Sequence, residues 1–354
     1  MRVLVVDPYY PVVLDAHYRA RPALRAEPYD AQWQALMDLA FGTSDAYSFN
    51  LRKLGHDARE VVPNCLPLQR AWAKEHRPRL AALPWRVAGP AILLEQAAWF
   101  RPDVVYVQSV GAFHPFVLRL LRRRARLLAG QLASGVPEQR RVESYDVLFT
   151  SFPHFLDRFG VPTHLLRIGF DQRVLDRLSP PAERHDVVFV GQLGGDEHRE
   201  ANSVIEAAAS EVPVDVWGPG VDEWPVGSPL RGRYHGVAWG AEMYRVLAAS
   251  RIALNRHLSS AEGHANNMRL FEATGVGTLL LTDVAAGLDS LFEPGREVVT
   301  YSDAADLVEK ARWYLEHEPE RAAVAAAGHA RTLSEHTYEE RMRELASVLE
   351  RYLS

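Results

Sequence analysis

The stretch "HANNMRLFEATGVGTLLLTD", from His264 to Asp283, shows the pattern on which the fold is built. A helix-forming segment ends at a Gly-x-Gly and is followed at once by an apolar run typical of a buried strand. A helix that leads directly into a buried strand is half of a βαβ unit. Arg269 and Glu272 stand inside this helix. Whether these charges face water or a ligand depends on the fold that the rest of the sequence predicts.

The same alternation extends in both directions. Predicted strands of the first half are apolar throughout, as expected of a parallel sheet covered on both faces. An irregular insertion rich in Pro, Tyr and Arg separates the first strand from residue 41. The predicted strands here are 3–6, 57–62, 102–108, 125–131 and 145–151, and the predicted helices are 46–54, 90–100, 114–124 and 152–160.

The pattern begins again after a Pro-containing linker. Strands are predicted at 186–190, 213–217, 250–255 and 278–283, and helices follow a glycine-rich loop near residue 195 and at 302–315. Alternating strands and helices predict a doubly wound parallel sheet in each half. We therefore expect an α/β protein with two Rossmann-like domains, 1–171 and 184–333, and a C-terminal helix over 334–354.

Composition limits the class of protein. The chain has 354 residues, a formal charge of −5 and one cysteine, Cys65. This length favours two domains, and the charge gives no reason to expect nucleic-acid binding. A single cysteine forms no intrachain disulfide, and no secretory signal or run of about 18 apolar residues is present. We expect a cytoplasmic protein without a transmembrane segment.

The glycine-rich loop after residue 190 has two interpretations. Gly191, Gly194 and Gly195 do not have the Gly-x-Gly-x-x-Gly spacing of a dinucleotide site. They bring a turn to a helix N-terminus, which favours phosphate, but they equally fit a tight strand-to-helix turn. No P-loop motif and no Asp-x-Asp pair occurs in the sequence, so neither P-loop hydrolysis nor a carboxylate-held metal is predicted.

Other charged groups near the opening stretch also have two readings. His257, Glu262 and His264 lie close together in the chain, but their spacing matches no standard metal site, so we expect polar lining and no metal. Arg269 and Glu272 are three residues apart, and this spacing alone favours a surface ion pair, since charged helix positions usually face water.

The C-terminal residues carry a family resemblance. The run from "NNMRLFEATGVGTLLLTD" through "SDAADLVEKARWYL" to "HTYEER" resembles the C-terminal domain of the spore-maturation-protein (CgeB-like) glycosyltransferases. The resemblance covers roughly residue 234 to the C-terminus, and a weaker likeness covers "GTSDAYSFNLRKLGHDAREVVPN" (42–64). It implies the GT-B fold, with two facing Rossmann-like domains and the last helix crossing back to the first.

The resemblance also implies roles for the charged pair. Glu272 stands where such transferases hold the ribose hydroxyls of the donor nucleotide, and a carboxylate can accept from both hydroxyls. The amides of Asn267 and Met268 are then expected at the diphosphate. Arg269, with Arg256 or Arg199, is expected to neutralise the leaving diphosphate without a metal.

Two positions depart from the family pattern. Related retaining enzymes often carry a second glutamate eight positions before the first, and this chain has His264 there. Many relatives have an arginine after the glycine of the loop, and this chain has Gln192 after Gly191, so His198 or Arg199 is expected to substitute.

The nucleotide base is expected beside the loops that follow "VDVWG" and "RYHGVAW". Trp217 and His235 are the candidates for side-chain contact and Val237 for backbone contact, although Trp217 fits a core residue equally well. The resemblance suggests a retaining reaction. An inverting one needs a base in the first domain, for which His114, Asp45 and His17 are candidates, each with an ordinary structural explanation.

These observations predict a metal-independent, retaining glycosyltransferase that needs no cofactor. Its donor is expected to be a nucleotide-diphosphate sugar, and its acceptor is unidentified. A nucleotide-sugar epimerase of the same fold and a catalytically silent nucleotide-sugar-binding module are the alternatives.

Overall fold

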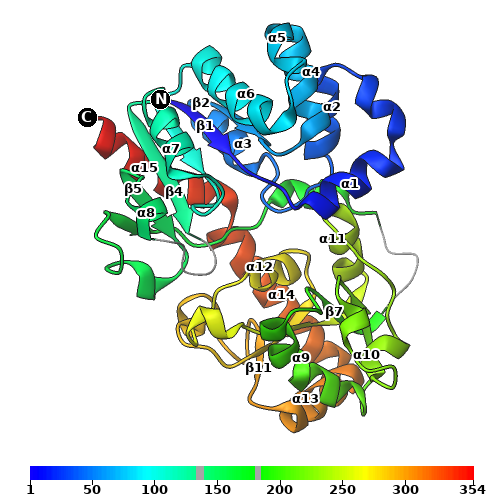
Figure 1. Cartoon of the computed structure of the whole chain (residues 1–354). Helices are drawn as coiled ribbons and strands as arrows, with labels where there is room; N and C mark the ends of the chain where they lie inside the picture. The colour runs from blue at the N-terminus through cyan, green and yellow to red at the C-terminus, as the bar shows by residue number, and fades with distance from the viewer. Residues whose placement is uncertain (133–138, 180–184) are drawn as a thin grey trace. The chain divides into compact units, whose positions relative to one another are not determined.

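The computed structural model describes residues 1–132, 139–179 and 185–354. The chain divides into two compact units (Figure 1). The N-terminal unit is Met1–Arg167 together with Tyr338–Ser354, and the C-terminal unit is Ile168–Thr337. Within the described ranges, no helix combines the length and apolarity needed to span a membrane.

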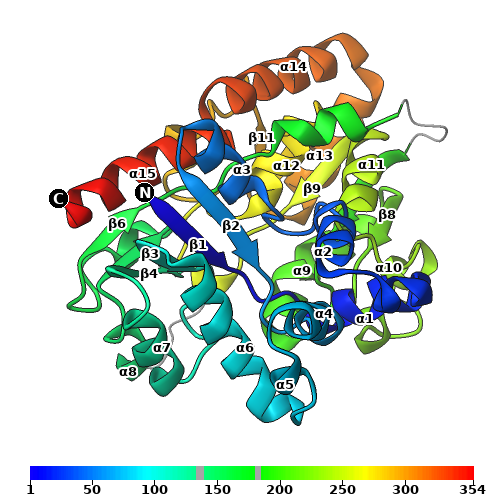
Figure 2. The ribbon, with the colours of Figure 1, turned by 90° about the horizontal axis from the view of Figure 1, so that it is seen from above.

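A six-stranded parallel sheet forms the centre of the N-terminal unit, in the order β2-β1-β3-β4-β5-β6. Figure 2 shows β1 beside β2. The β-branched and aromatic sequences of these strands explain their burial, since both faces of a parallel sheet are covered. The strands are β1 (Arg2–Val6), β2 (Asp57–Val61), β3 (Val104–Val107), β4 (Leu127–Leu132), β5 (Val147–Thr150) and β6 (Thr163–Leu165).

The C-terminal helix belongs to the core of this unit. In α15 (Tyr338–Leu353), Met342, Leu345 and Leu349 are buried in one cluster with Tyr47 of α3 (Ala46–Lys53) and with the β1 and β3 side chains of one sheet face. Spacings of three and four residues between the apolar positions give α15 one buried stripe.

Helices also fill the segment that the sequence pattern treats as an irregular insertion. Helix α1 begins at Pro11, a favourable first helical position, and buries Val13, Leu14, His17 and Tyr18. The prediction of an irregular insertion is therefore wrong. The helices of this unit are α1 (Pro11–Ala20), η1 (Pro22–Ala26), α2 (Tyr29–Met37), α3, α4 (Leu66–His76), α5 (Pro78–Ala81), α6 (Trp85–Phe100), α7 (Pro115–Arg122), α8 (Gln139–Val142), η2 (Pro153–Phe155) and α15.

Two other helix predictions differ from the structure. The predicted helix at 152–160 shortens to the single turn η2. Helix α6 begins at Trp85, five residues before the predicted start, and holds Pro90 inside its first turns. In both segments proline misleads a boundary placed from propensity, because proline is tolerated near a helix start but also favours turns.

The C-terminal unit has a five-stranded parallel sheet in the order β11-β10-β9-β7-β8. Helices α9 and α13 pack on one face of the sheet, and α11 and α12 contact each other and β9. The strands are β7 (His185–Val190), β8 (Val214–Trp217), β9 (Ser250–Asn255), β10 (Leu279–Asp283) and β11 (Val299–Tyr301). The helices are η3 (Gln172–Arg177), α9 (Asp196–Ala209), η4 (Val221–Glu223), α10 (Pro229–Gly232), α11 (Ala241–Ala248), η5 (Ser259–Ala261), α12 (Met268–Gly275), η6 (Leu288–Ser290), α13 (Ala304–Glu316) and α14 (Glu318–Glu335).

Candidate functional site

The carboxyl edge of the C-terminal sheet is organised around the start of α12. Asn267 caps this helix, because its Oδ1 accepts from Leu270 N at 3.2 Å. Its Nδ2 donates to Asn255 Oδ1 at 2.8 Å and to the Arg256 carbonyl at 3.1 Å. One side chain thus fixes the helix N-terminus to the end of β9. No partner for the amides of Met268 and Arg269 is found in the described part of the chain, so they remain available to an anion.

Arg269 and Glu272 form a buried pair. Their side chains are 13% and 8% exposed, and Arg269 Nη1 lies 3.0 Å from Glu272 Oε2. Arg269 Nη2 donates to the carbonyl of Val190, the last residue of β7, at 2.9 Å. Burial raises the pKa of Glu272, and the Arg269 charge partly offsets this. The interpretation as a surface pair is therefore wrong: both charges lie inside the unit, beside the carboxyl end of β7.

Two nitrogen atoms of the Arg269 guanidinium have no acceptor in this arrangement of the described residues. Arg269 Nε and Nη1 are buried without a hydrogen bond among the described residues, so Nη1 interacts with Glu272 by charge and not by a well-aligned hydrogen bond. Buried polar groups without partners are uncommon in folded proteins and call for an explanation. A ligand with acceptor oxygens provides one, as does repacking of the pair when a ligand arrives.

Arg256 is a second buried cation at this edge. It directly follows β9 and is 8% exposed. Its Nε donates to Asn202 Oδ1 at 2.6 Å, and its Nη2 lies 2.9 Å from His198 Nδ1, which must accept because a guanidinium only donates. Burial lowers the pKa of Arg256. Within the described ranges it has no carboxylate at ion-pair distance, which makes it a candidate anion ligand.

His257 and Asp283 form a pair that the sequence did not reveal. They follow β9 and end β10, and His257 Nδ1 lies 2.7 Å from Asp283 Oδ1. The carboxylate also accepts from the His257 amide. His257 Nε2 is buried and has no partner among the described residues. The residues are 26 apart, and only the neighbouring positions of β9 and β10 bring them together.

The glycine loop is closed by its own unit. Gly191 N donates to the Trp217 carbonyl at 2.9 Å, and Gly195 N donates to Glu223 Oε2 at 2.8 Å. A Cβ on Gly218 would lie 1.7 Å from the Gly191 carbonyl oxygen, so two loops are in tight contact. With these amides occupied and two acidic residues in the first turn of α9, the structure favours the tight-turn interpretation over phosphate binding at Gly191.

The Gln192 side chain also forms a hydrogen bond within this loop, since its Nε2 donates to the Gly194 carbonyl at 3.2 Å. Of the two expected substitutes for the missing arginine, His198 contacts Arg256, whereas Arg199 is exposed on α9. The structure therefore brings His198, and not Arg199, to the cation at the sheet edge.

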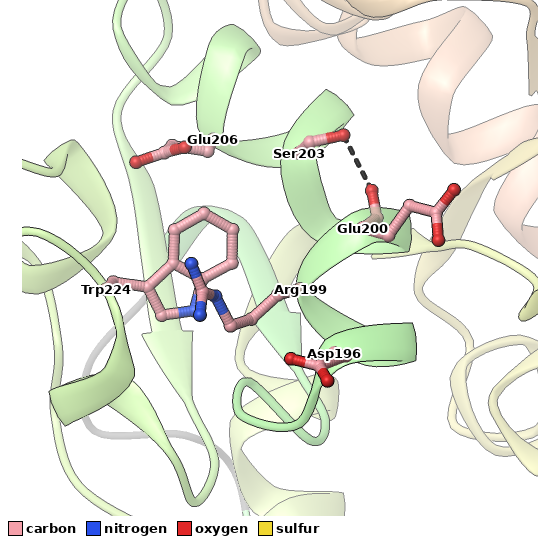
Figure 3. Close-up of a pocket in the computed structure, with 6 residues that line it drawn as sticks. All are labelled: Asp196, Arg199, Glu200, Ser203, Glu206 and Trp224. Atoms are coloured by element: carbon pink, nitrogen blue, oxygen red, sulfur yellow. Dashed lines mark hydrogen bonds between the residues drawn. The ribbon is translucent and has the colours of Figure 1, made fainter.

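Arg199 lies in a surface hollow of about 380 Å³. Figure 3 shows its lining, including Ser203 Oγ donating to the Glu200 carbonyl at 2.6 Å. Three acidic residues and one arginine line this hollow, a charge balance that opposes a diphosphate. The lining residues are Asp196, Arg199, Glu200, Ser203, Glu206 and Trp224.

The expected base contacts are partly occupied. The Trp217 and His235 rings are stacked at 4.6 Å, and Trp217 is 8% exposed. His235 Nε2 contacts Asp215 Oδ1 at 2.9 Å. A base cannot reach the Trp217 face that His235 covers, whereas the His235 side chain is itself exposed. Val237 is 45% exposed and stays a prediction for backbone contact.

The remaining residues that the sequence suggested for the site occupy helix caps, a buried helix face or a backbone bridge. His114 Nδ1 accepts from Phe116 N and caps α7. His17 is buried in α1, and burial lowers its pKa. Asp45 occupies the cap position of α3 without a side-chain cap hydrogen bond. His264 pairs with Ala286 through a backbone bridge beside the candidate site.

Comparison with known proteins identifies the fold. A family model described as glycosyl transferase-like matches residues 199–347. The chain is similar to a glycosyltransferase from Rickettsia africae ESF-5 (TM-score 0.62, 11% identity, covering 100% of this chain and 98% of that chain). It is also similar to Anabaena Alr3699/HepE in complex with UDP-glucose (0.62, 14%, 99% and 99%). A third similar structure is sucrose-phosphate synthase (tll1590) from Thermosynechococcus elongatus (0.60, 13%, 100% and 99%). No curated protein matches the chain.

These comparisons and the two parallel sheets establish the GT-B type of fold. The family model is that of glycosyl transferase-like proteins in general. The narrower resemblance to the spore-maturation-protein family stays a prediction.

Proposed function

We propose that the chain is a glycosyltransferase that binds a nucleotide-diphosphate sugar at the carboxyl edge of the C-terminal sheet. The observation that carries this proposal is the buried Arg269–Glu272 pair beside the carboxyl end of β7. An ion pair that only decorated a surface helix would not be buried, because burial of two charges costs more than exposed pairing gains. Ligands of α/β sheets bind at this edge.

The proposed roles follow from the chemistry of each group. Glu272 accepts hydrogen bonds from the ribose hydroxyls, and the Arg269 charge partly offsets the rise in the pKa of that carboxyl caused by burial. The amides of Met268 and Arg269 and the guanidinium of Arg256 bind the diphosphate. As the bond between the anomeric carbon and the diphosphate oxygen breaks, negative charge grows on the diphosphate, where these donors stabilise it.

Metal independence and a retaining course are parts of the proposal. Two guanidinium groups at the sheet edge, Arg256 and Arg269, supply positive charge that a divalent ion supplies in other transferases. His264 takes the place of the sugar-reading glutamate of related retaining enzymes, so the sugar it selects is expected to differ from theirs. The UDP-glucose held by the similar Anabaena protein makes UDP-glucose the first donor to try.

A binding panel followed by a turnover assay tests the proposal. Thermal melts are recorded with nucleotide diphosphates and nucleotide sugars, with and without EDTA. A ligand at 100 times its dissociation constant stabilises the protein by about 2.7 kcal/mol. We expect one base family to raise the melting temperature in EDTA, and to lose this effect in Glu272→Gln but not in Glu242→Gln.

Turnover then separates the three activities. Donor consumption that requires an acceptor supports a transferase. Conversion of the sugar without an acceptor identifies an epimerase, and binding without any turnover identifies a silent module. A panel in which no nucleotide shifts the melt, or in which Glu272→Gln responds like the wild type, contradicts the proposed donor site.

A further inference from the structure

Three polar side chains meet at the carboxyl edge of the N-terminal sheet. Asp7 follows β1, Gln108 follows the neighbouring β3, and Thr43 lies in the loop before α3. Gln108 Nε2 donates to Thr43 Oγ1 at 2.9 Å, and Thr43 Oγ1 donates to Asp7 Oδ2 at 3.4 Å. All three residues are only partly buried. A chain of hydrogen bonds from three separate segments thus ends on one carboxyl group that a ligand can reach.

The Asp7 carboxyl group keeps most of its capacity to accept hydrogen bonds. Its Oδ1 has no partner among the described residues, and no Lys, Arg or His of those residues lies at ion-pair distance. Burial raises the pKa of Asp7 to about 7, although the Thr43 hydrogen bond acts to lower it. A carboxyl group with such a pKa can accept or donate a hydrogen bond near neutral pH, which suits an uncharged hydroxyl partner.

The loop that carries Thr43 has a strained backbone. Ala40, Gly42 and Ser44 have φ angles of 51°, 59° and 48°, all in the left-handed region. Such angles cost a non-glycine residue about 1–3 kcal/mol and persist only where the surroundings fix them. Ser44 Oγ donates to the Met37 carbonyl at 2.7 Å and supplies part of that support. Strain of this kind concentrates at functional sites, and here it sets the position of Thr43.

Aromatic residues lie close in sequence to this polar group in both segments. Tyr10 comes three residues after Asp7, and Phe41 comes two before Thr43. Their ring centroids are 5.5 Å apart in an edge-to-face arrangement, and Tyr10 is 60% exposed. Ligand sites combine apolar and aromatic walls with a few convergent polar groups. A sugar ring has both an apolar C–H face and hydroxyl groups, and so matches this combination.

We propose that Asp7, Thr43 and Gln108 form a binding site for an uncharged, hydroxyl-rich ligand, a sugar or polyol, whose hydroxyl donates to Asp7 and whose ring contacts Tyr10. The further step, that this ligand is the acceptor of glycosyl transfer, rests on the proposed function. The opposing explanation is that the three side chains only hold the loop over residues 40–44 in place.

Saturation-transfer-difference NMR on the whole chain tests the site with a panel of unlabelled monosaccharides, disaccharides and polyols. The variants are Asp7→Asn, which keeps the size of the side chain, and Tyr10→Ala. Asp57→Asn is the matched control, because Asp57 stands at the opposite, amino end of the same sheet in an exposed pair with Arg2. We expect at least one compound to bind, with an affinity about tenfold lower in Asp7→Asn and unchanged in Asp57→Asn.

Several outcomes overturn the proposal. They are a panel without a binder, equal affinity in wild type and Asp7→Asn, and equal losses in Asp7→Asn and Asp57→Asn. Stabilisation by the nucleotide donor is measured on the same samples and should survive in Asp7→Asn. If the saccharide binds but no nucleotide does, the proposed function fails while this site stands. If the nucleotide binds but no saccharide does, the site fails and the donor proposal stands.

Discussion

The two sheets of this chain end in different chemistry. At the carboxyl edge of the C-terminal sheet, Arg256, Arg269 and Glu272 are charged and buried. At the carboxyl edge of the N-terminal sheet, the hydrogen bonds of the Asp7 side chain among the described residues lead to the neutral side chains of Thr43 and, through it, Gln108. The same strand-to-helix architecture thus presents fixed charges in one unit and neutral hydrogen-bonding groups in the other.

This difference indicates which ligands each edge can hold. Buried cations attract an anion strongly because no water screens them, so the C-terminal edge suits a diphosphate. A carboxyl group without a cation beside it repels phosphate but accepts from a hydroxyl, so the N-terminal edge suits an uncharged partner. Substitutions that remove one group at a time test whether the two edges differ in this way.

The largest effect is expected from Glu272→Ala. Removal of one partner of a buried ion pair leaves Arg269 uncompensated and costs about 3–5 kcal/mol of the free energy of unfolding. The matched control is Glu242→Ala, because Glu242 forms an exposed pair with Arg245 at the same helical spacing. That change should cost less than about 0.5 kcal/mol. Thermal melts of both variants provide the measurement, and equal losses would mean that the buried pair contributes no more than a surface one.

Arg256→Met is expected to reduce affinity for a nucleotide diphosphate by about 10- to 100-fold, since a charge-assisted hydrogen bond contributes about 1.5–3 kcal/mol. Arg251→Met is its control, because Arg251 lies on the same strand at the amino end and pairs with Asp186 in an exposed position. Isothermal titration calorimetry of both variants gives the ratio. If Arg251→Met weakens binding as much as Arg256→Met, the effect is one of net charge and not of position.

The raised pKa of Asp7 should be visible in the pH dependence of the free energy of unfolding. Its pKa is about 7 in the folded protein and 3.8 ordinarily. Between pH about 4 and 7 the folded state keeps a proton that the unfolded state releases, so the stabilising contribution of Asp7 falls as pH rises through this window and is lost above it. Asp7→Asn should therefore gain stability relative to wild type as pH rises from about 4 to 7, and keep that gain at higher pH, in melts at successive pH values.

Neighbouring groups are common to both proteins in this comparison. Glu60, whose pKa burial raises to about 8, titrates in wild type and variant alike. Burial raises the pKa values of Tyr9 and Tyr47, so both stay neutral in this range. The charge of Asp45 also raises the pKa of Tyr9, and it does so in both proteins. Parallel pH profiles for wild type and Asp7→Asn would show that Asp7 has an ordinary pKa.

The smallest effect is expected from Gln192→Ala. Among the described residues, the Gln192 side chain bonds within its own loop, to the Gly194 carbonyl, and the loop amides of Gly191 and Gly195 are already paired. Affinity for a nucleotide diphosphate should change less than about threefold, or roughly 0.7 kcal/mol. A loss of affinity above tenfold, measured by the same calorimetry, would indicate that the glycine loop binds the diphosphate.

Periodicity was enough to predict parallel sheets whose strands alternate with helices. Apolar runs bounded by turn residues are local signals, and β1, β3 and β10 carry them in full. Helices α1 and α2 lacked such a signal because their buried faces include polar residues, His17 in α1 and Gln32 in α2, which break the apolar periodicity. Tertiary packing of Tyr18 and Leu36, and not propensity, stabilises them.

Burial of charge could not be predicted from spacing. Arg269 and Glu272 have the same separation as the exposed pair of Glu293 and Arg296, and only the fold distinguishes the two. Asp7 was also missed, because an aspartate after a strand and before proline resembles an ordinary turn residue. Its partners stand 36 and 101 positions away and meet it only through the parallel sheet.

The most direct test of the donor site combines a change in the protein with a change in the ligand. Affinities of wild type and Glu272→Gln are measured by calorimetry in EDTA, for the best-binding nucleoside diphosphate and for its 2′,3′-dideoxy form. If Glu272 accepts from the ribose hydroxyls, removing them should weaken wild type about tenfold or more and the variant less than about twofold. An equal loss in both proteins would contradict this role of Glu272 and with it the proposed orientation of the donor.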